Sequence, residues 1–325
     1  MKRLKAKGGA YYHLVTRCAL QHYLFSDEDK RVFIAMMRRV AAFCGLNVLT
    51  HCVMSNHYHI LIHVPVSKSL SEKELLARVG ILYGAAREKE MRLRWDAYRK
   101  ENLLQVLEKE QSHLRQRMFD ISPFMKSLNQ RFSVWYRSHH KGHSGTLWES
   151  RFGSTLVEGN GSLAAVAAYI DLNPVRAGVV TAPEDYAYSG YGAAMSGDPE
   201  ALSGLSGVYG DASRGANPDK VMAAYRGLLY SDGAANLDPV TVKQVMAGRK
   251  TMPLPQLLRC KIRAMTKGMA IGSKTFTDAI FKNHRASFSE NRRHPPLGGA
   301  LCPEWDGIQI CSVRRLRKNS VIFTA

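Results

Sequence analysis

The sequence predicts an α+β fold, with a small antiparallel sheet in the ferredoxin-like, split β-α-β arrangement and helices on one face of that sheet. Three observations favour this fold class. Residues 11–17 are aromatic and β-branched, as is typical of a strand. An amphipathic segment of helical length follows, and two apolar strands at 46–53 and 57–64 are separated only by a short turn. The order β-α-β-β suits an antiparallel sheet with helices packed on one side.

The ends of these elements carry capping and turn residues. Ser26 can cap the first helix, and Gly45 offers a left-handed residue where that helix ends. Pro65 closes the third strand, because proline cannot donate to a ladder. The local signals therefore agree with the order of elements.

Three further elements are expected in the second half of this domain. Ser122-Pro123 indicates the start of a helix, with proline at the first helical position. Residues 147–157 have an extended pattern. The turn at 160–162 leads into an alanine-rich helix over residues 163–172.

The chain of 325 residues is longer than one average domain, which predicts a second, smaller unit. We expect a catalytic domain over residues 1–192, with a charged helical insertion at about 71–118. Gly, Ala, Ser and Asp dominate the following stretch, so a linker is expected at 193–218. Residues 219–325 are expected to form a basic, mostly helical C-terminal DNA-binding unit.

The net charge of +19 indicates an anionic partner. Residues 241–325 contain 16 Lys and Arg against 4 Asp and Glu, whereas residues 181–240 contain 3 against 8. Nucleic acid explains such an excess best, because each neutralised phosphate releases counterions. A solvated basic surface and a membrane-surface patch are the alternatives.

The C-terminal unit has two helices that could contact DNA. They are expected at 254–265 and 274–283, where Ser273 can cap the second one. The pair fits a helix-turn-helix and equally an ordinary helical hairpin. Basic clusters favour phosphate contacts in this unit, through Arg292, Arg293, Arg314 and Arg315.

Several protein classes are disfavoured by composition. No apolar run approaches the roughly 20 residues of a membrane span, and the basic start leads into glycines instead of an apolar signal core. A cytoplasmic protein without a membrane partner is therefore expected. The 6 cysteines are scattered without a C-x-x-C pair, so neither a disulfide framework nor a zinc ribbon is indicated.

Two histidines are expected on one face of the third strand. Side chains alternate across a strand, so His57 and His59 point the same way, about 7 Å apart at the backbone, a spacing suited to holding one ion. His63 has the same parity but lies about 13 Å beyond His59, too far to share the ion. His63 is expected to be structural, as are His51 and His13.

Tyr169 and Asn173 are expected on one face of the alanine-rich helix, because they are four residues apart. Pro174 places Asn173 at the end of that helix. Taken alone, Tyr169 fits a core aromatic and Asn173 a helix stop. The histidine pair favours a catalytic role instead.

A phenol needs help to act as a nucleophile, since its unperturbed pKa is about 10. A divalent ion held by two imidazoles and an amide oxygen would polarise a phosphate and stabilise a departing 3′-oxygen. Mg²⁺ prefers oxygen ligands and Mn²⁺ accepts imidazole, so the sequence leaves both ions open.

Five passages of the chain carry a family resemblance. They are residues 9–17, 53–61, 145–152, 169–178 and 188–191. In this order and spacing they resemble the single-tyrosine HUH transposases of the REP-associated tyrosine transposase type, relatives of small insertion-sequence transposases that move single-stranded DNA. The resemblance covers about residues 8–192. Ser55 replaces the proline usual in the family, Tyr58 is bulkier than usual, and the insertion and basic tail lie outside the shared region.

The resemblance implies roles for individual residues. His57 and His59 would bind Mg²⁺ or Mn²⁺. Tyr169 would form a 5′-phosphotyrosine link, and Asn173 would be the third protein ligand of the metal. Two arginines would face DNA or brace the site, Arg151 and Arg176.

We therefore expect a transposase-like endonuclease and strand transferase that cleaves and rejoins single-stranded, hairpin-flanked, REP-like DNA. One alternative is a domesticated DNA-binding regulator with a vestigial nuclease site. Another is a metal-dependent nuclease that hydrolyses DNA with water, in which Tyr169 is structural. The sequence leaves open whether the protein is a monomer or a homodimer.

Overall fold

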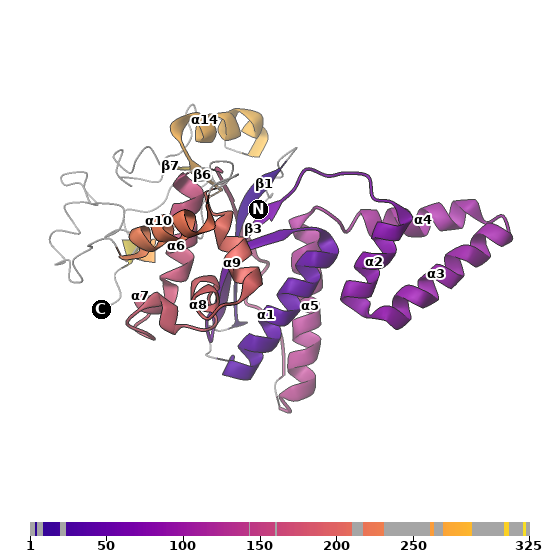
Figure 1. Cartoon of the computed structure of the whole chain (residues 1–325), viewed down its shortest axis with the longest axis horizontal. Coiled ribbons are helices and arrows are strands. Elements are labelled where there is room, and N and C mark those ends of the chain that lie inside the picture. The colour runs from indigo at the N-terminus through magenta and orange to yellow at the C-terminus, as the bar shows by residue number, and fades with distance from the viewer. Residues whose placement is uncertain are drawn as a thin grey trace.

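The computed structural model describes residues 4, 9–19, 24–142, 144–159, 161–209, 217–230, 261–262, 269–287, 309–311 and 321–322. Within this part of the chain, the centre is a six-stranded sheet with the strand order β2-β3-β1-β4-β6-β7 (Figure 1). Its strands are β1 (Ala10–Arg17), β2 (Asn47–Val53), β3 (His57–Val64), β4 (Gly153–Val157), β6 (Ala270–Gly272) and β7 (Gln309–Cys311). A separate antiparallel pair consists of β5 (Lys261–Ile262) and β8 (Val321–Ile322).

The helices surround this sheet. They are α1 (Asp27–Cys44), α2 (Glu72–Tyr83), α3 (Ala85–Lys100), α4 (Leu104–Arg115), α5 (Ile121–His139), α6 (Gly161–Asp171), α7 (Asn173–Arg176), α8 (Gly190–Met195), α9 (Pro199–Ser206), α10 (Pro218–Tyr230) and α14 (Lys274–Asn283). Two short 3₁₀ turns are η2 (Pro183–Asp185) and η4 (Arg285–Ser287). None of the described helices has the length and hydropathy that a membrane crossing requires.

The predicted α+β class and its β-α-β-β beginning are confirmed. Strands β2, β3, β1 and β4 pair antiparallel, and their spatial order is that of a split β-α-β sheet. The first helix has the expected ends: the Ser26 side chain caps the Asp29 amide at its start, and Gly45 has φ of 68° at its end. Helix α5 begins at Ile121, slightly before the predicted start, because Asp120 caps the Ser122 amide.

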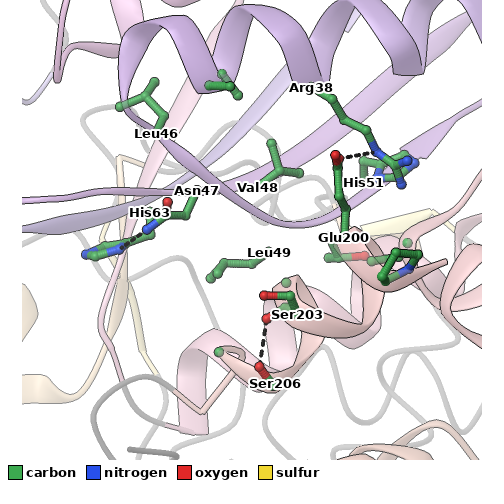
Figure 2. Close-up of a pocket in the computed structure, with 18 of the residues that line it drawn as sticks. Arg38, Leu46, Asn47, Val48, Leu49, His51, His63, Glu200, Ser203 and Ser206 are labelled. Atoms are coloured by element: carbon green, nitrogen blue, oxygen red, sulfur yellow. Dashed lines mark hydrogen bonds and ion pairs between the residues drawn. The ribbon is translucent and has the colours of Figure 1, made fainter. Parts of the chain in front are cut away.

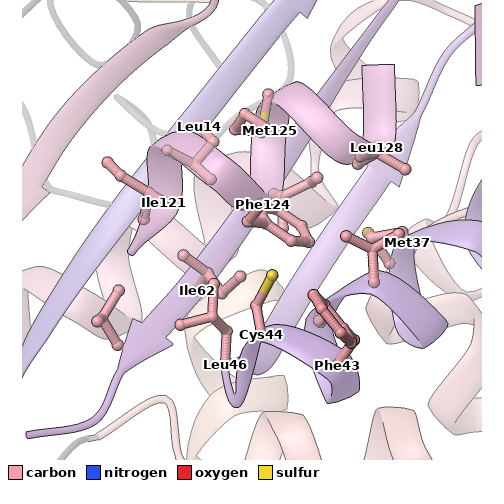
Figure 3. Close-up of a cluster of buried hydrophobic side chains, with 14 of the residues drawn as sticks. Leu14, Met37, Phe43, Cys44, Leu46, Ile62, Ile121, Phe124, Met125 and Leu128 are labelled. Carbon is pink, nitrogen blue, oxygen red and sulfur yellow. The ribbon is translucent and has the colours of Figure 1, made fainter. Parts of the chain in front are cut away.

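A large apolar cluster fills the space between the sheet and the pair α1 and α5. Leu14 of β1 and Ile62 of β3 contribute from the sheet, and Met37 and Phe124 contribute from the two helices (Figure 3). Each of these four side chains is fully buried. Burial of this apolar area is the main stabilising term, at about 25 cal/mol per Å², and it fixes one face of the sheet.

The other face of the sheet is covered as well. A second apolar cluster joins Leu61 of β3 to the alanine-rich helix α6 and to Leu205 of α9 and Tyr225 of α10. The expectation of helices on one face therefore describes the split β-α-β core alone, and the structure adds a second helical layer. Helix α6 of this layer carries Tyr169.

The predicted helical insertion is present as α2, α3 and α4. Figure 1 shows these helices extending away from the sheet, beside α1 and α5. Trp95 is fully buried between them and donates a hydrogen bond to Glu110 (2.8 Å). The buried apolar side chains of the insertion, Trp95 included, belong to the same apolar cluster as those between the sheet and α1 and α5.

Within the described residues, part of the stretch expected as a linker, 193–218, is helical. It contains α9, which packs against β2, and Leu205 and Val208 are fully buried. A Cβ on Gly204 would lie 2.5 Å from the Val48 carbonyl oxygen. The absence of a side chain at Gly204 permits this close approach of helix to strand.

The C-terminal unit contributes strands as well as helices. Helix α14 has the predicted bounds and the predicted Ser273 cap. Strand β6 pairs in parallel with β4, so this unit extends the main sheet. Residues 261–262, expected as helix, form β5, and the remainder of the predicted helix at 254–265 lies outside the described residues.

Candidate active site

Two neighbouring strands place three histidines on the α6 side of the sheet. His57 and His59 share this face of β3 with Leu61, since side chains alternate along a strand. His13 of β1 lies directly opposite Leu61 in the antiparallel ladder, so it points to the same face. The predicted pairing of His57 and His59 on one face is therefore present, and His13 joins them.

The imidazoles contact one another and their neighbours through defined nitrogens. His13 Nε2 lies 2.8 Å from His59 Nδ1, and the two rings are stacked with centroids 5.0 Å apart. His57 Nδ1 lies 2.6 Å from Asn56 Oδ1, and the His57 and His59 ring centroids are 5.1 Å apart. Because His13 contacts Nδ1 of His59 and Asn56 contacts Nδ1 of His57, a metal ion would be bound through the Nε2 atoms of these two histidines.

Asn173 completes one side of this cluster. Its Nδ2 atom lies 3.1 Å from His57 Nε2, and a rotation of the amide by about 180° would present Oδ1 at the same position. Asn173 begins α7, just after the end of α6. The residue expected at the end of the alanine-rich helix is therefore also a neighbour of His57.

Tyr169 of α6 faces the same histidines. Its ring lies edge-on to His59, with centroids 6.3 Å apart, and to His13, with centroids 6.4 Å apart. Only 3% of the residue is exposed. The Tyr169 ring thus lies beside the imidazoles and is itself a member of the second apolar cluster.

Arg176 contacts both the ring and the backbone of Tyr169. Its guanidinium carbon lies 4.0 Å from the Tyr169 ring centroid, and Nη2 donates to the Tyr169 carbonyl oxygen (2.6 Å). A cation over an aromatic face is attractive and fixes the ring. Arg176 is half-buried.

A buried carboxylate anchors the helix that carries Tyr169. Asp171 is fully buried, and its oxygens accept hydrogen bonds from Thr50 Oγ1 (2.8 Å) and Tyr225 Oη (2.6 Å). The Tyr191 amide donates a third bond (3.2 Å). Desolvation raises the pKa of Asp171 to about 7, although these hydrogen bonds oppose the shift. The bonds tie α6 to β2, α8 and α10, which fixes the rotation of α6 and so the direction of Tyr169.

Burial also affects His59. Desolvation, followed by the nearby His13 and His57, holds the pKa of His59 well below its ordinary value. His59 is therefore neutral near pH 7. A neutral imidazole is the form that binds a metal ion.

The donor set fits a divalent metal of the kind expected from the sequence. In the described part of the chain, no group of three His, Cys, Asp or Glu residues is arranged to hold a metal. The Asn173 amide, 3.1 Å from His57 Nε2, is a candidate third ligand. Two imidazoles with an amide oxygen suit Mn²⁺, or Mg²⁺ with additional oxygen ligands.

One other predicted DNA contact lies within the described residues. Arg151 is exposed in the segment before β4. The remaining four predicted contacts lie outside the described residues: Arg292, Arg293, Arg314 and Arg315.

Sequence reasoning missed two residues of the site. His13 was expected to be structural, yet it contacts His59 across the sheet. Asp171 was passed over, although an acidic residue inside an alanine-rich apolar helix is itself a signal. Tyr58, the bulky residue between the two histidines, points to the other face and packs against Phe33, with ring centroids 4.4 Å apart.

A cavity of about 820 Å³ lies elsewhere, between α1, β2 and α9 (Figure 2). Arg38 lines it and is paired with both Asp198 (2.8 Å) and Glu200 (3.1 Å). His51 also lines it. Since the arginine charge is already neutralised by two carboxylates, the cavity is a poor place for a phosphate, in contrast to the surroundings of Tyr169.

Comparison with known proteins gives a family match. Residues 6–73 match the family described as "Transposase IS200 like". The resemblance to these transposases is confirmed for this segment, which includes His57 and His59 but not Tyr169 or Asn173. No curated protein matches the chain significantly. A solved structure described as "Structure of the REP associates tyrosine transposase bound to a REP hairpin" is similar over 60% of this chain and 84% of its own, at 12% sequence identity and a TM-score of 0.36.

Proposed function

Since residues 6–73 match the IS200-like transposases, we propose that the chain is a DNA strand transferase that uses Tyr169 as its nucleophile. The substrate is single-stranded DNA beside a hairpin. The protein cleaves one strand, keeps its 5′ end as a phosphotyrosine, and rejoins it to a 3′-hydroxyl. We infer this substrate class from the resemblance of the sequence motifs to those of the transposase family.

One observation carries the proposal: Tyr169 from α6 lies edge-on to two buried imidazoles from two different strands, His13 and His59. Tyr169 is more than a hundred positions away from either histidine in the sequence. A core tyrosine needs no such neighbours, whereas a nucleophilic phenol needs polar groups that stabilise the charge developing on phosphate.

The covalent step needs no reactant other than Tyr169 and the DNA strand. The Tyr169 oxygen attacks phosphorus, the bond from phosphorus to O3′ breaks, and the phenol proton ends on the released 3′-hydroxyl. The phosphotyrosine keeps the energy of the broken ester, so a second 3′-hydroxyl can reverse the step. No nucleotide cofactor is needed.

A divalent ion would be held by His57, His59 and Asn173, and when bound it would polarise the phosphate and stabilise the departing 3′-oxygen. His13 orients the His59 ring through its hydrogen bond to Nδ1. Arg176 supplies a positive charge next to the phenol.

The burial of Tyr169, only 3% exposed, favours a second candidate, a nuclease in which water replaces the phenol as nucleophile. Labelled, hairpin-flanked single-stranded DNA incubated with Mn²⁺ distinguishes the two on a denaturing gel. We expect a covalent adduct with the wild-type protein that Tyr169→Phe abolishes, with DNA affinity unchanged. Cleavage that persists in Tyr169→Phe would support hydrolysis, and binding without any cleavage would support a regulator.

A further inference from the structure

A group of two arginines and a tyrosine lies on the side of the sheet opposite to Tyr169, at the end of α2. Tyr83 is the last residue of α2 and is 40% exposed. Arg117 follows α4, and its Nη1 donates to the Tyr83 hydroxyl (2.8 Å). Arg131 of α5 has its guanidinium carbon 4.7 Å from the Tyr83 ring centroid. We call these three residues the Tyr83 patch.

The positive charges of the Tyr83 patch have no acidic partner among the described residues. In the same insertion, other arginines form ion pairs: Arg87 with Glu90, Arg92 with Glu88, Arg99 with Asp96, and Arg115 with Glu108. The insertion therefore neutralises most of its arginines, and Arg117 is an exception, as is Arg131 of the neighbouring helix α5. Two uncompensated guanidinium groups on one ring form a local positive surface.

Helix capping does not explain these two arginines. Arg39 donates to the Ile81 and Leu82 carbonyls at the end of α2, and Arg78 donates to the Phe43 carbonyl at the end of α1. Those two are satisfied as C-terminal caps. Within the described part of the chain, Arg117 and Arg131 have no such carbonyl contacts. Arg117 lies over the Phe43 ring and bonds the Tyr83 hydroxyl, and Arg131 lies over the Tyr83 ring.

Aromatic packing holds the patch in place. The Arg117 guanidinium carbon lies 4.5 Å from the Phe43 ring centroid, and the Phe43 ring is edge-on to Tyr83 with centroids 5.9 Å apart. Burial would raise the pKa of Tyr83, but hydrogen bonds and charge from Arg117 and Arg131 lower it overall. The local potential is thus positive, and the guanidinium planes are ordered before any ligand binds.

We propose that the Tyr83 patch is a second DNA-contacting surface, in which Arg117 and Arg131 bind backbone phosphates and the exposed Tyr83 ring contacts a base or sugar. This inference rests on the proposed function. Arginine forks match phosphate oxygens, and aromatic faces stack on bases. Because the sheet separates the patch from Tyr169, it contacts DNA several nucleotides from the cleaved bond and sets affinity, not the rate of chemistry.

The test compares Arg117→Gln/Arg131→Gln with the matched control Arg92→Gln/Arg115→Gln, which removes two paired arginines from the same insertion. Both full-length variants are titrated against fluorescent hairpin-flanked single-stranded DNA at several salt concentrations, and their unfolding is checked by circular dichroism. We expect the patch variant to lose about tenfold or more in affinity, and its salt slope to fall by about 1–2 for two lost phosphate contacts. The single-turnover cleavage rate at saturating DNA should equal that of the control.

Equal DNA affinity and equal salt slope in the two variants would overturn the proposal that the Tyr83 patch binds DNA. Weaker affinity without a change in salt slope would also overturn it, because phosphate contacts must release counterions. The proposed function fails separately: a wild-type protein that forms no adduct, but whose DNA affinity depends on Arg117 and Arg131, has a DNA-binding patch without strand transfer.

Discussion

Two buried histidines of this protein, His59 and His51, have the same side chain in opposite surroundings. His59 has a hydrogen-bond partner in His13, the Tyr169 ring beside it, and His57 on the same strand. His51 is equally buried beside the cavity, but its Nε2 has no hydrogen-bond partner in the described part of the chain. Burial lowers the pKa of both residues.

This contrast teaches that burial alone does not indicate function. The cost of burying an imidazole is offset at His59 by groups that converge on it, whereas at His51 the cost remains. Convergent partners from separate elements are what a ligand or reaction site needs. We therefore expect substitutions around His59 to change the chemistry, and substitutions of His51 to change stability alone.

The largest expected effect is from the metal ligands themselves. His59→Ala removes an imidazole that is to hold the ion, so the rate of adduct formation should fall by about 1,000-fold or more. Single-turnover gels with Mn²⁺ measure this rate, and DNA affinity serves as the control. A rate within a few-fold of wild type would remove His59 from the mechanism.

A smaller effect is expected from His13, which orients His59. His13→Ala should lower the rate by about 10–100-fold and weaken the Mn²⁺ dependence. His13→Gln can offer a nitrogen or oxygen at the same position and should restore most of the rate. Equal defects in both variants, unrelieved by excess Mn²⁺, would mean that His13 supports packing only.

Arg176 comes next in size. Arg176→Gln removes a ring contact and a charge-assisted bond, so we expect a loss of about tenfold in rate, with partial recovery in Arg176→Lys. The measurement is the single-turnover rate against DNA concentration. The idea is contradicted if only affinity changes, because Arg176 is argued to act next to the phenol.

His51→Leu should leave the rate unchanged and alter the response of stability to pH. Desolvation lowers the pKa of His51 to about 3, whereas the unfolded value is about 6.5. Between these values the unfolded chain binds a proton that the folded chain does not, so the free energy of unfolding falls as the pH drops, by at most roughly 5 kcal/mol. His51→Leu should remove this contribution to the fall in the free energy of unfolding at low pH.

Urea unfolding at about pH 7 and about pH 4.5 checks that result. The surface substitution His113→Leu is the matched control. We expect His51→Leu to be at least as stable as wild type near neutrality and less sensitive to acid. If His51→Leu and His113→Leu lose stability with acid as steeply as wild type does, His51 is not the titrating group.

The parts of the fold that sequence could predict have local causes. The alternation in β3 placed His57 and His59 on one face, and Ser26 and Gly45 marked the ends of α1. The contact of His13 with His59 depends on the pairing of β1 with β3. The two histidines are 46 positions apart, so no local sequence pattern predicts this contact. The packing of α9 was missed because small residues such as Gly204 are common both in linkers and at close helix contacts.

The most direct test of the central claim is to identify the residue that becomes linked to DNA. The adduct formed with hairpin-flanked single-stranded DNA and Mn²⁺ is digested with nuclease and protease and analysed by mass spectrometry. We predict a single nucleotide attached through its 5′-phosphate to the peptide containing Tyr169. A nucleotide on any other residue, or cleavage products whose new phosphate oxygen comes from ¹⁸O-labelled water, would contradict the account.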